Sequence, residues 1–543
     1  MNMNEIPTIQ RDVKKISTIA DWWRECHKDP SLLYHEDDVA KRAGLRVALI
    51  NPPHIQNKKF FARVAFEPVG LAYVASSLEK AGFEVKIVDA IGEAFDQYNV
   101  FDNERVTVGL SFDEICQSVE EFAPDFIGIG APFTVRAEAI YKCSDVLKAC
   151  PALKDIPIFS GGIHCSTYPK ETLSQSSIDF VIQGEGEVTS VLLLDALRDN
   201  SPELYNLPCL AFKNDDGSVK LNARGQGIDD LDALPHPARH LLNMENYMKA
   251  AKRFRSGRGG GSRFASVTTS RGCPLQCTFC TTHDMMGRKY RYRSPQNVID
   301  ELLLLKREYN VEEIHFEDDQ LTIRRGRFEE MMDLMIQHDI NVKWDTPNGV
   351  LASSIASPEI IEKMKKSGCW YICVAPESGD QEVVDQIIKK KQKLTKVDFV
   401  VEHAAKLGIR VDAFFVIGSI GETKQQIMNS IEYAKKLRRL GAKWCHFHIA
   451  TPFDGTPLYK LAEAHGYLVE KKGGQEFAGE MRIKTDNFTP EEIDEFYVAA
   501  HSMNPRFEPL RLKLALSAFR QEPLKVFKAF VRFLTTKNSH MSQ

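Results

Sequence analysis

The stretch "TTSRGCPLQCTFCTTHDMMG", residues 268–287, decides the fold because it places three cysteines in one short loop. Their spacing is Cys273-x3-Cys277-x2-Cys280. Structural zinc sites need four protein ligands, and the nearest candidate for a fourth, His283, lies in the same crowded loop. Three thiolates suit a 4Fe–4S cluster that leaves one iron open to an outside molecule. The loop therefore predicts a cluster whose fourth iron is free for chemistry.

The composition is that of a globular chain with more than one domain. The sequence has 543 residues, of which 43% are hydrophobic and 27% charged, and its net charge is -4. This length predicts two to four domains, and the charge argues against a dedicated nucleic-acid binder. The N-terminus has no apolar core like that of a signal peptide, and no apolar run reaches the roughly 20 residues of a membrane-spanning helix. We therefore expect a cytoplasmic address, where cysteines are thiols or metal ligands rather than disulfides.

From residue 46 onward, short apolar strands alternate with amphipathic helices. "RVALINPP", "EVKIVDA", "PDFIGIGAP", "IPIFSGG" and "DFVIQGEGE" are the strands of this region. Such an alternation predicts an α/β domain with a doubly wound, Rossmann-like parallel sheet. Ligands of these sheets bind at the carboxyl ends of the strands, where this sequence has glycine- and proline-rich loops. The loops favour a large flat or phosphate-bearing cofactor.

A second alternation follows the cysteine loop and predicts a partial barrel of six β/α units. The expected strands are 264–270, 314–317, 342–346, 370–376, 410–417 and 443–450, so the cysteine loop comes directly after the first. The tail reads as two basic amphipathic helices. The predicted organisation is an N-terminal extension (1–45), the sheet domain (46–200), a linker (201–261), the barrel (262–455) and a helical C-terminal region (456–543).

The three cysteines resemble the C-x3-C-x2-C signature of the radical S-adenosylmethionine (SAM) enzymes. In that family the motif follows the first strand of a partial (β/α)6 barrel, and the amino and carboxylate groups of SAM chelate the open iron. The resemblance implies reductive cleavage of SAM to a 5′-deoxyadenosyl radical. It also implies SAM contacts from the aromatic residue before the third cysteine and from the later strand ends. These residues are Phe279, Asp318, Asp319, Glu377, Ser378 and Gly418.

The sheet domain resembles the cobalamin-binding domain that precedes the barrel in one subclass of this family. "PVGLAYVASSLEKAGFEVKIVDA", "GGIHCSTYPKETL" and "DFVIQGEGE" carry the likeness. The D-x-H-x-x-G motif of other cobalamin proteins is missing around His54, so we expect cobalt without a histidine ligand from that motif; His164 is a weaker alternative. The residues expected at cobalamin are Asn51, Pro52, Gly70, Leu71, Pro132, Phe133, Thr134, Gly161, Gly162, Gly184, Glu185 and Gly186.

Within the subclass, "GRKYRYRS", "DTPNG" and "ESGDQEVVDQIIKKK" resemble most the methyltransferases of sp3 carbons, such as phosphonate C-methyltransferases. The resemblance implies hydrogen abstraction by the 5′-deoxyadenosyl radical and methyl transfer from methylcobalamin. Oxidative cyclisation and ring rearrangement use the same cofactors and remain alternatives. A tRNA methylthiotransferase would need three further cluster cysteines in front, and a cobalamin-sensing protein would leave the cysteine loop idle.

The expected partners are a small-molecule substrate, anionic or lipid in character, and an electron donor such as flavodoxin or ferredoxin. Arg291 and Arg293 are candidates to bind an anion of the substrate or cofactor. Cys369 and Cys373 are better explained as core thiols than as a second cluster. The tail combines leucine and phenylalanine with basic residues, which fits peripheral membrane contact or, more commonly, a cap on the barrel. These basic residues are Arg506, Arg511, Lys513, Arg520, Lys525, Lys528 and Arg532.

Overall fold

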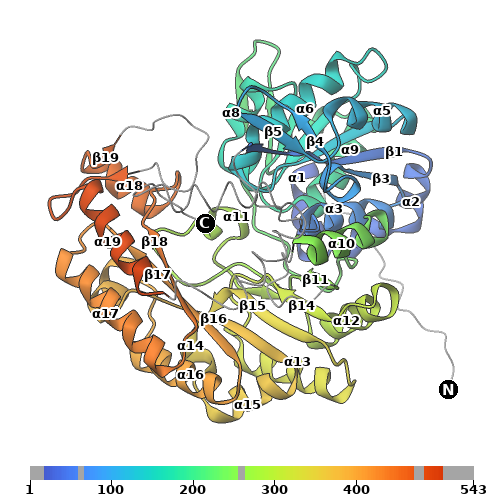
Figure 1. Ribbon diagram of the computed structural model, residues 1–543. Coiled ribbons are helices and arrows are strands. Elements are labelled where there is room, and N and C mark those ends of the chain that lie inside the picture. The colour runs from blue at the N-terminus through green and yellow to red at the C-terminus, as the bar shows by residue number, and fades with distance from the viewer. Residues whose placement is uncertain (1–17, 59–65, 255–262, 470–481, 505–543) are drawn as a thin grey trace. The chain divides into compact units, whose positions relative to one another are not determined.

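The computed structural model describes residues 18–58, 66–254, 263–469 and 482–504 (Figure 1). The chain divides into two compact units. The first comprises Met1–Phe60 with Pro68–Asn243, and the second comprises Phe61–Glu67 with Met244–Gln543. Among the described residues, no helix has both the length and the apolar character needed to cross a membrane.

The first unit is built on a seven-stranded sheet in the order β10-β9-β8-β7-β6-β1-β3. Five strands run parallel: β1 (Arg46–Asn51), β3 (Glu84–Asp89), β6 (Phe126–Gly130), β7 (Ile158–Gly161) and β8 (Phe180–Ile182). The helices between them include α3 (Val69–Lys80), α5 (Phe112–Phe122), α6 (Ala137–Ala149), α7 (Ile163–Thr167) and α8 (Pro169–Gln175), and α9 (Gly186–Arg198) follows β8. Five of the six β1 residues are buried, as the apolar run predicts for a central parallel strand. The predicted doubly wound α/β fold is confirmed.

Two antiparallel strands, β9 (Leu210–Lys213) and β10 (Val219–Leu221), extend this sheet at the β8 edge. They fall within the stretch that the sequence assigns to a linker. A second, three-stranded sheet joins β2 (His54–Asn57), β5 (Arg105–Val108) and β4 (Tyr98–Val100). His54, expected in a loop, is thus the first residue of a short strand paired with Val108.

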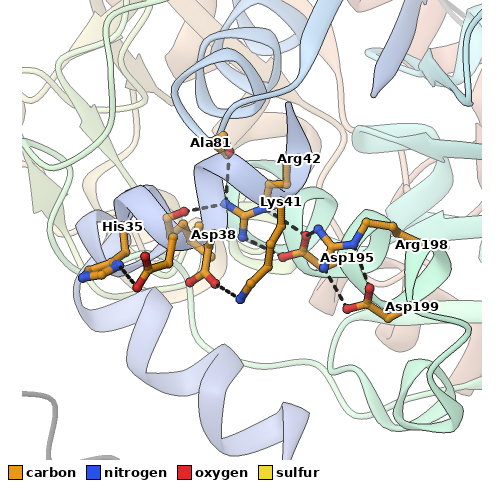
Figure 2. Close-up of polar contacts among 10 residues, drawn as sticks. His35, Asp38, Lys41, Arg42, Ala81, Asp195, Arg198 and Asp199 are labelled. Atoms are coloured by element: carbon orange, nitrogen blue, oxygen red, sulfur yellow. Dashed lines mark hydrogen bonds and ion pairs between the residues drawn. The ribbon is translucent and has the colours of Figure 1, made fainter. Parts of the chain in front are cut away.

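Residues 18–45, predicted to be an extension, pack onto the first unit. Trp23 of α1 (Ile19–Lys28) donates its indole N–H to Thr189 of α9 at 3.0 Å. Arg42 ends α2 (Glu36–Arg42), and its guanidinium binds Asp195 of α9 and the carbonyl of Ala81 (Figure 2). These buried polar contacts tie the segment to the domain that follows it.

The second unit contains six parallel strands in chain order, β11-β14-β15-β16-β17-β18, which form the predicted partial barrel (Figure 1). They are β11 (Phe264–Val267), β14 (Glu313–Phe316), β15 (Lys343–Val350), β16 (Cys369–Glu377), β17 (Arg410–Ile417) and β18 (Trp444–Ile449). The connecting helices are α12 (Pro295–Tyr309), α13 (Arg325–Gln337), α14 (Ala352–Ile355), α15 (Pro358–Lys366), α16 (Leu394–Lys406) and α17 (Lys424–Leu440). The predicted fold class is confirmed here as well.

The two faces of the barrel sheet differ in character. On the helix-covered face, the ring of Phe415 stacks on Phe447 at 4.7 Å and meets Tyr433 of α17. On the opposite face, the His315 imidazole contacts the Asp345 carboxylate at 2.9 Å. An apolar outer layer therefore holds the helices, while the inner wall is polar.

After the barrel come α18 (Pro457–Ala464), the pair β19 (Leu468–Val469) and β20 (Arg482–Ile483), and α19 (Pro490–Ser502). The amide side chain of Asn504, just after α19, accepts from the backbone N–H of Cys445 at 3.0 Å and so attaches this region to β18. The basic helices expected in the tail, from Arg506 to Arg532, lie outside the described residues.

Candidate functional site

The cysteine loop begins directly after β12 (Ser270–Arg271), which follows β11. Cys273 and Cys277 are buried, Cys280 is half-buried, and all three are free thiols. Gly272 has φ 81°, and a Cβ there would lie 2.4 Å from the carbonyl oxygen of Lys289, so only glycine fits. The loop is a tight turn that brings its thiols to the carboxyl ends of the barrel strands.

These thiols fit a metal cluster by their chemistry. Burial raises the pKa of Cys273 to about 11 and that of Cys277 to about 12, and the charges of neighbouring cysteines add to this rise. Sulfur atoms that close together cannot all ionise without a cation, and iron supplies the missing positive charge. The donor set therefore suits a 4Fe–4S cluster.

Asp318 and Asp319, both predicted to face the SAM amino group, have different surroundings. The Asp318 carboxylate is 2% exposed and accepts from the backbone N–H and the hydroxyl of Thr269. Asp319 is half-buried and accepts from the Thr282 hydroxyl at 3.2 Å. Burial raises the pKa of both carboxyls. Asp318 therefore holds the loop before the cysteines, and Asp319 is the better placed of the two for a ligand's ammonium group.

Glu377 and Ser378, the predicted ribose contacts, end and follow β16. The Glu377 carboxylate forms a buried ion pair with Lys390 at 2.5 Å. The Ser378 hydroxyl contacts the Ser430 hydroxyl of α17 at 2.9 Å, on the helix side of the sheet. Glu377 thus lies beside the predicted site, whereas Ser378 is occupied by internal packing; both ribose roles stay predictions.

Gly418 follows β17 with φ 85° and would meet Ile493 of α19 if it had a side chain. Its backbone N–H donates at 2.8 Å to Glu422, whose carboxylate also accepts from Ser419. Burial raises the Glu422 pKa to about 8. Phe279, in the cysteine loop, packs against the apolar cluster around Val416. Glu422 was not predicted from the sequence, although it directly follows the second of the two glycines Gly418 and Gly421.

The first unit has its own candidate site at the carboxyl ends of its parallel strands. The strand order reverses between β1 and β6, the point where such sheets bind ligands. Asn51, at the end of β1, donates to Asp89 at 2.7 Å and accepts from Arg136 at 3.1 Å. Arg136 is buried and also binds the carbonyl of Pro52. Arg136 was not predicted, since a lone arginine before a helix gives no sequence signal.

The loops at this edge expose apolar side chains and contain a tight glycine turn. Phe133 is 58% exposed, Val135 is 47% exposed and Ile163 is 36% exposed. Gly162 has φ 124°, and a Cβ there would lie 2.4 Å from the carbonyl oxygen of Ala131. Exposed apolar groups above such a glycine turn fit a large flat ligand. Pro132 and Thr134 lie in the same loops, Gly161 ends β7, and Gly70 and Leu71 lie in the first turn of α3.

Three predicted cobalamin contacts, Gly184, Glu185 and Gly186, follow β8, and two of them form hydrogen bonds within the protein. Gly184 has φ 84° and donates its N–H to the Ser166 hydroxyl at 2.9 Å. The Glu185 carboxylate is buried and accepts from the backbone N–H of Ile228 at 2.6 Å. Gly186 begins α9. Glu185 therefore holds the segment around residue 228.

His54 and His164 lie close in sequence to the predicted cobalamin contacts. His164 is 1% exposed, and its Nε2 contacts the Tyr141 hydroxyl at 2.7 Å. Burial lowers the pKa of His164 and of His54 to about 4, with Arg136 adding to the effect at His54. Both imidazoles are therefore neutral near pH 7, the form that binds metals, and cobalt without a histidine ligand from the D-x-H-x-x-G position stays a prediction.

Arg291 and Arg293, the proposed anion-binding pair, are buried beside the cysteine loop. Arg291 donates to the carbonyl of Met286 at 2.8 Å. Arg293 forms an ion pair with the fully buried Glu301. These partners explain both residues as supports of the loop, so their contacts do not favour the anion-binding role. Cys369 and Cys373 are fully buried in β16, as expected of core thiols.

Comparisons with known proteins agree with this geometry. The model of the radical SAM superfamily matches residues 267–434, and that of the B12 binding domain matches residues 62–194. The cytidylyl-2-hydroxyethylphosphonate methyltransferase of Streptomyces wedmorensis is 32% identical over 486 residues, or 81% of this chain and 87% of the relative. The chain belongs to the cobalamin-binding radical SAM enzymes.

A further relative and two solved structures also resemble this chain. An uncharacterised methyltransferase of Pyrococcus horikoshii is 29% identical and covers 84% of this chain and 92% of its own. TsrM from Kitasatospora setae, solved with cobalamin and a 4Fe–4S cluster, matches with a TM-score of 0.62 at 16% identity over 86% of this chain and 91% of its own. OxsB, solved with aqua-cobalamin and SAM, matches with a TM-score of 0.66 at 16% identity over 91% of this chain and 74% of its own.

This cobalamin-binding radical SAM enzyme is therefore a methyltransferase that uses a 4Fe–4S cluster, SAM and cobalamin. A small-molecule substrate is in keeping with the family. Which residues contact each cofactor stays a prediction.

Proposed function

We propose that this enzyme methylates an unactivated sp3 carbon of a small molecule. The observation that carries the proposal is that a radical SAM domain and a B12 binding domain occur in one chain. Three free thiols lie in a loop after the first barrel strand, and apolar, glycine-rich loops lie at the strand ends of the preceding sheet. When bound, the cluster with SAM supplies a hydrogen-abstracting radical, and cobalamin supplies the methyl group.

The chain's own residues bind and orient the cofactors. Cys273, Cys277 and Cys280 hold the iron, and Asp319 accepts from the ligand's ammonium group beside them. Phe279, which packs in the apolar cluster with Val416, lies against the adenine of SAM. The loops bearing Phe133 and Gly162 receive the corrin. We also propose a low-potential electron donor such as flavodoxin or ferredoxin.

The substrate is a small molecule, and the relative from Streptomyces wedmorensis is named for a cytidylylated hydroxyethylphosphonate. That compound is the first candidate to test. Other family members are named as cyclases of magnesium-protoporphyrin IX monomethyl ester, so cyclisation is the reaction to distinguish.

The test uses the full chain, reconstituted anaerobically with iron, sulfide and cobalamin. It is incubated with SAM, a reductant and either the cytidylylated phosphonate or a metabolite extract. We expect 5′-deoxyadenosine, S-adenosylhomocysteine and a product heavier by one methyl group. Cys280→Ala should abolish all three, whereas Cys150→Ala, another partly exposed thiol, should not. Deoxyadenosine without S-adenosylhomocysteine would favour cyclisation, and neither product from a loaded enzyme would refute the proposal.

A further inference from the structure

Three consecutive lysines follow the π-helix Val383–Ile388, and only the middle one is buried. Lys390 is 4% exposed, whereas Lys389 and Lys391 are exposed. Both flanking lysines have left-handed backbone, with φ 64° and 57°. Such a conformation is unfavourable for a non-glycine residue and persists only where the surroundings impose it. The backbone is thus bent so that a single ammonium group is held inside.

The buried ammonium group has one carboxylate partner. Its Nζ lies 2.5 Å from Glu377 Oε1, at the carboxyl end of β16. Glu377 is itself 6% exposed and has φ 67°, so both members of the pair are held in place by strained backbone. Gln392 fixes the same segment, because its amide donates to the carbonyl of Ala375 at 3.1 Å.

The segment that carries Lys390 is bonded directly to the cysteine loop. Thr278, between the second and third cysteines, donates its backbone N–H to the carbonyl of Ile388 and its hydroxyl to the carbonyl of Ile387, each at 3.1 Å. Lys390 follows Ile388 by two residues. The ammonium group is therefore fixed relative to the thiols by the chain's own hydrogen bonds.

The charge of Lys390 acts on these thiols. Lys390 is buried in the segment whose carbonyls accept from Thr278, within two residues of that contact, and Thr278 lies between two of the three cysteines. A fixed cation in a low-dielectric site stabilises added negative charge.

We propose that Lys390 is a positioning residue that raises the reduction potential of the cluster held by Cys273, Cys277 and Cys280. This proposal rests on the proposed function only in that it takes these three cysteines to be the cluster ligands. One electron added to the cluster is stabilised by the ammonium group and destabilised by the Glu377 carboxylate. Removing the charge of Lys390 should therefore lower the potential, and removing the charge of Glu377 should raise it.

The experiment is a potentiometric titration of the reconstituted full chain, followed by electron paramagnetic resonance without SAM. Omitting SAM separates an effect on the cluster from one on SAM binding. We expect Lys390→Met to lower the reduction equilibrium constant about tenfold, which is about 59 mV for a one-electron couple. Glu377→Gln should raise the potential. Lys390→Arg keeps the positive charge and should leave the potential near the wild-type value. Lys389→Met and Lys391→Met are matched controls and should leave it unchanged, since exposed charges are screened.

An unchanged potential in a fully loaded Lys390→Met variant would overturn the proposal, as would an equal shift in either control. If Lys390→Met does not retain a cluster, Glu377→Gln decides: an upward shift supports the proposal and an unchanged potential refutes it. A wild-type chain that binds no cluster, or a Cys280→Ala variant that binds one normally, would instead count against the proposed cysteine site.

Discussion

The carboxylate of Asp318 accepts hydrogen bonds from the backbone N–H and from the hydroxyl of Thr269, at 3.1 and 2.8 Å. It thereby ties the end of the second barrel strand to the chain that leads into the cysteine loop. Asp319, the next residue, is turned to Thr282 on the far side of that loop. Adjacent aspartates at one strand end thus have separable roles.

Asp318→Asn should weaken the loop rather than SAM binding itself. The variant replaces a carboxylate oxygen with an amide N–H₂, which cannot accept from Thr269 or Ser270. Unpaired buried donors cost about 1–3 kcal/mol. We expect a lower unfolding temperature and less iron per chain after reconstitution. Full iron content at wild-type stability would contradict this role.

Asp319→Asn should leave the loop intact and weaken the binding of SAM. The half-buried carboxylate accepts from the Thr282 hydroxyl, and the amide oxygen of asparagine can still accept from it. Losing a charge-assisted hydrogen bond to an ammonium group costs about 1.5–3 kcal/mol, so the Kd for SAM should rise about tenfold or more. Anaerobic equilibrium binding with normal iron content measures this. If the Kd rises only in Asp318→Asn, the two roles are exchanged.

Glu422→Gln should flatten the dependence of stability on pH. Burial raises the Glu422 pKa from its ordinary 4.5 to about 8. Between these values the folded chain keeps a proton that the unfolded chain has lost, so its stability falls as the pH rises through 8. The slope is at most about 1.4 kcal/mol per pH unit. Unfolding temperatures from pH 6 to 9 should therefore fall less in the variant, and equal slopes would refute the assignment.

The fold was predictable because its main signals are local. The apolar run 410–417 coincides with β17, and the loop after the first barrel strand contains the three cysteines where the spacing predicted a cluster. A central strand such as β1 is buried along nearly its whole length, so it reads as an apolar run without knowledge of its neighbours.

The missed features depend on distant partners. Among three identical lysines, nothing in the sequence marks Lys390 as the buried one, because Glu377 and the cysteine loop decide it. Arg136 reaches Asn51 across 85 positions. The strands β9 and β10 are short and flank a polar turn, so their sequence resembles a linker, and only their pairing at the sheet edge identifies them as strands.

The N-terminal segment offers a stability test of the first unit. The Arg42 side chain is 3% exposed and binds Asp195 at 2.6 Å, together with the carbonyls of Leu33 and Ala81. Arg42→Met leaves these acceptors without a donor, while Asp195 keeps Arg198 as a partner at 3.0 Å. We expect a loss of about 2–3 kcal/mol in the stability of this unit.

The matched control is Arg24→Met. Arg24 also pairs with an aspartate, Asp21, at 2.7 Å, but its side chain is 61% exposed, so the change should cost less than about 1 kcal/mol. Urea unfolding, with hydrogen exchange of α1, α2 and α9 as the local readout, compares the two variants. Faster exchange confined to Arg42→Met would show that residues 18–45 belong to the cooperative core of the first unit. Equal exchange in both variants would show that the segment is only attached to its surface.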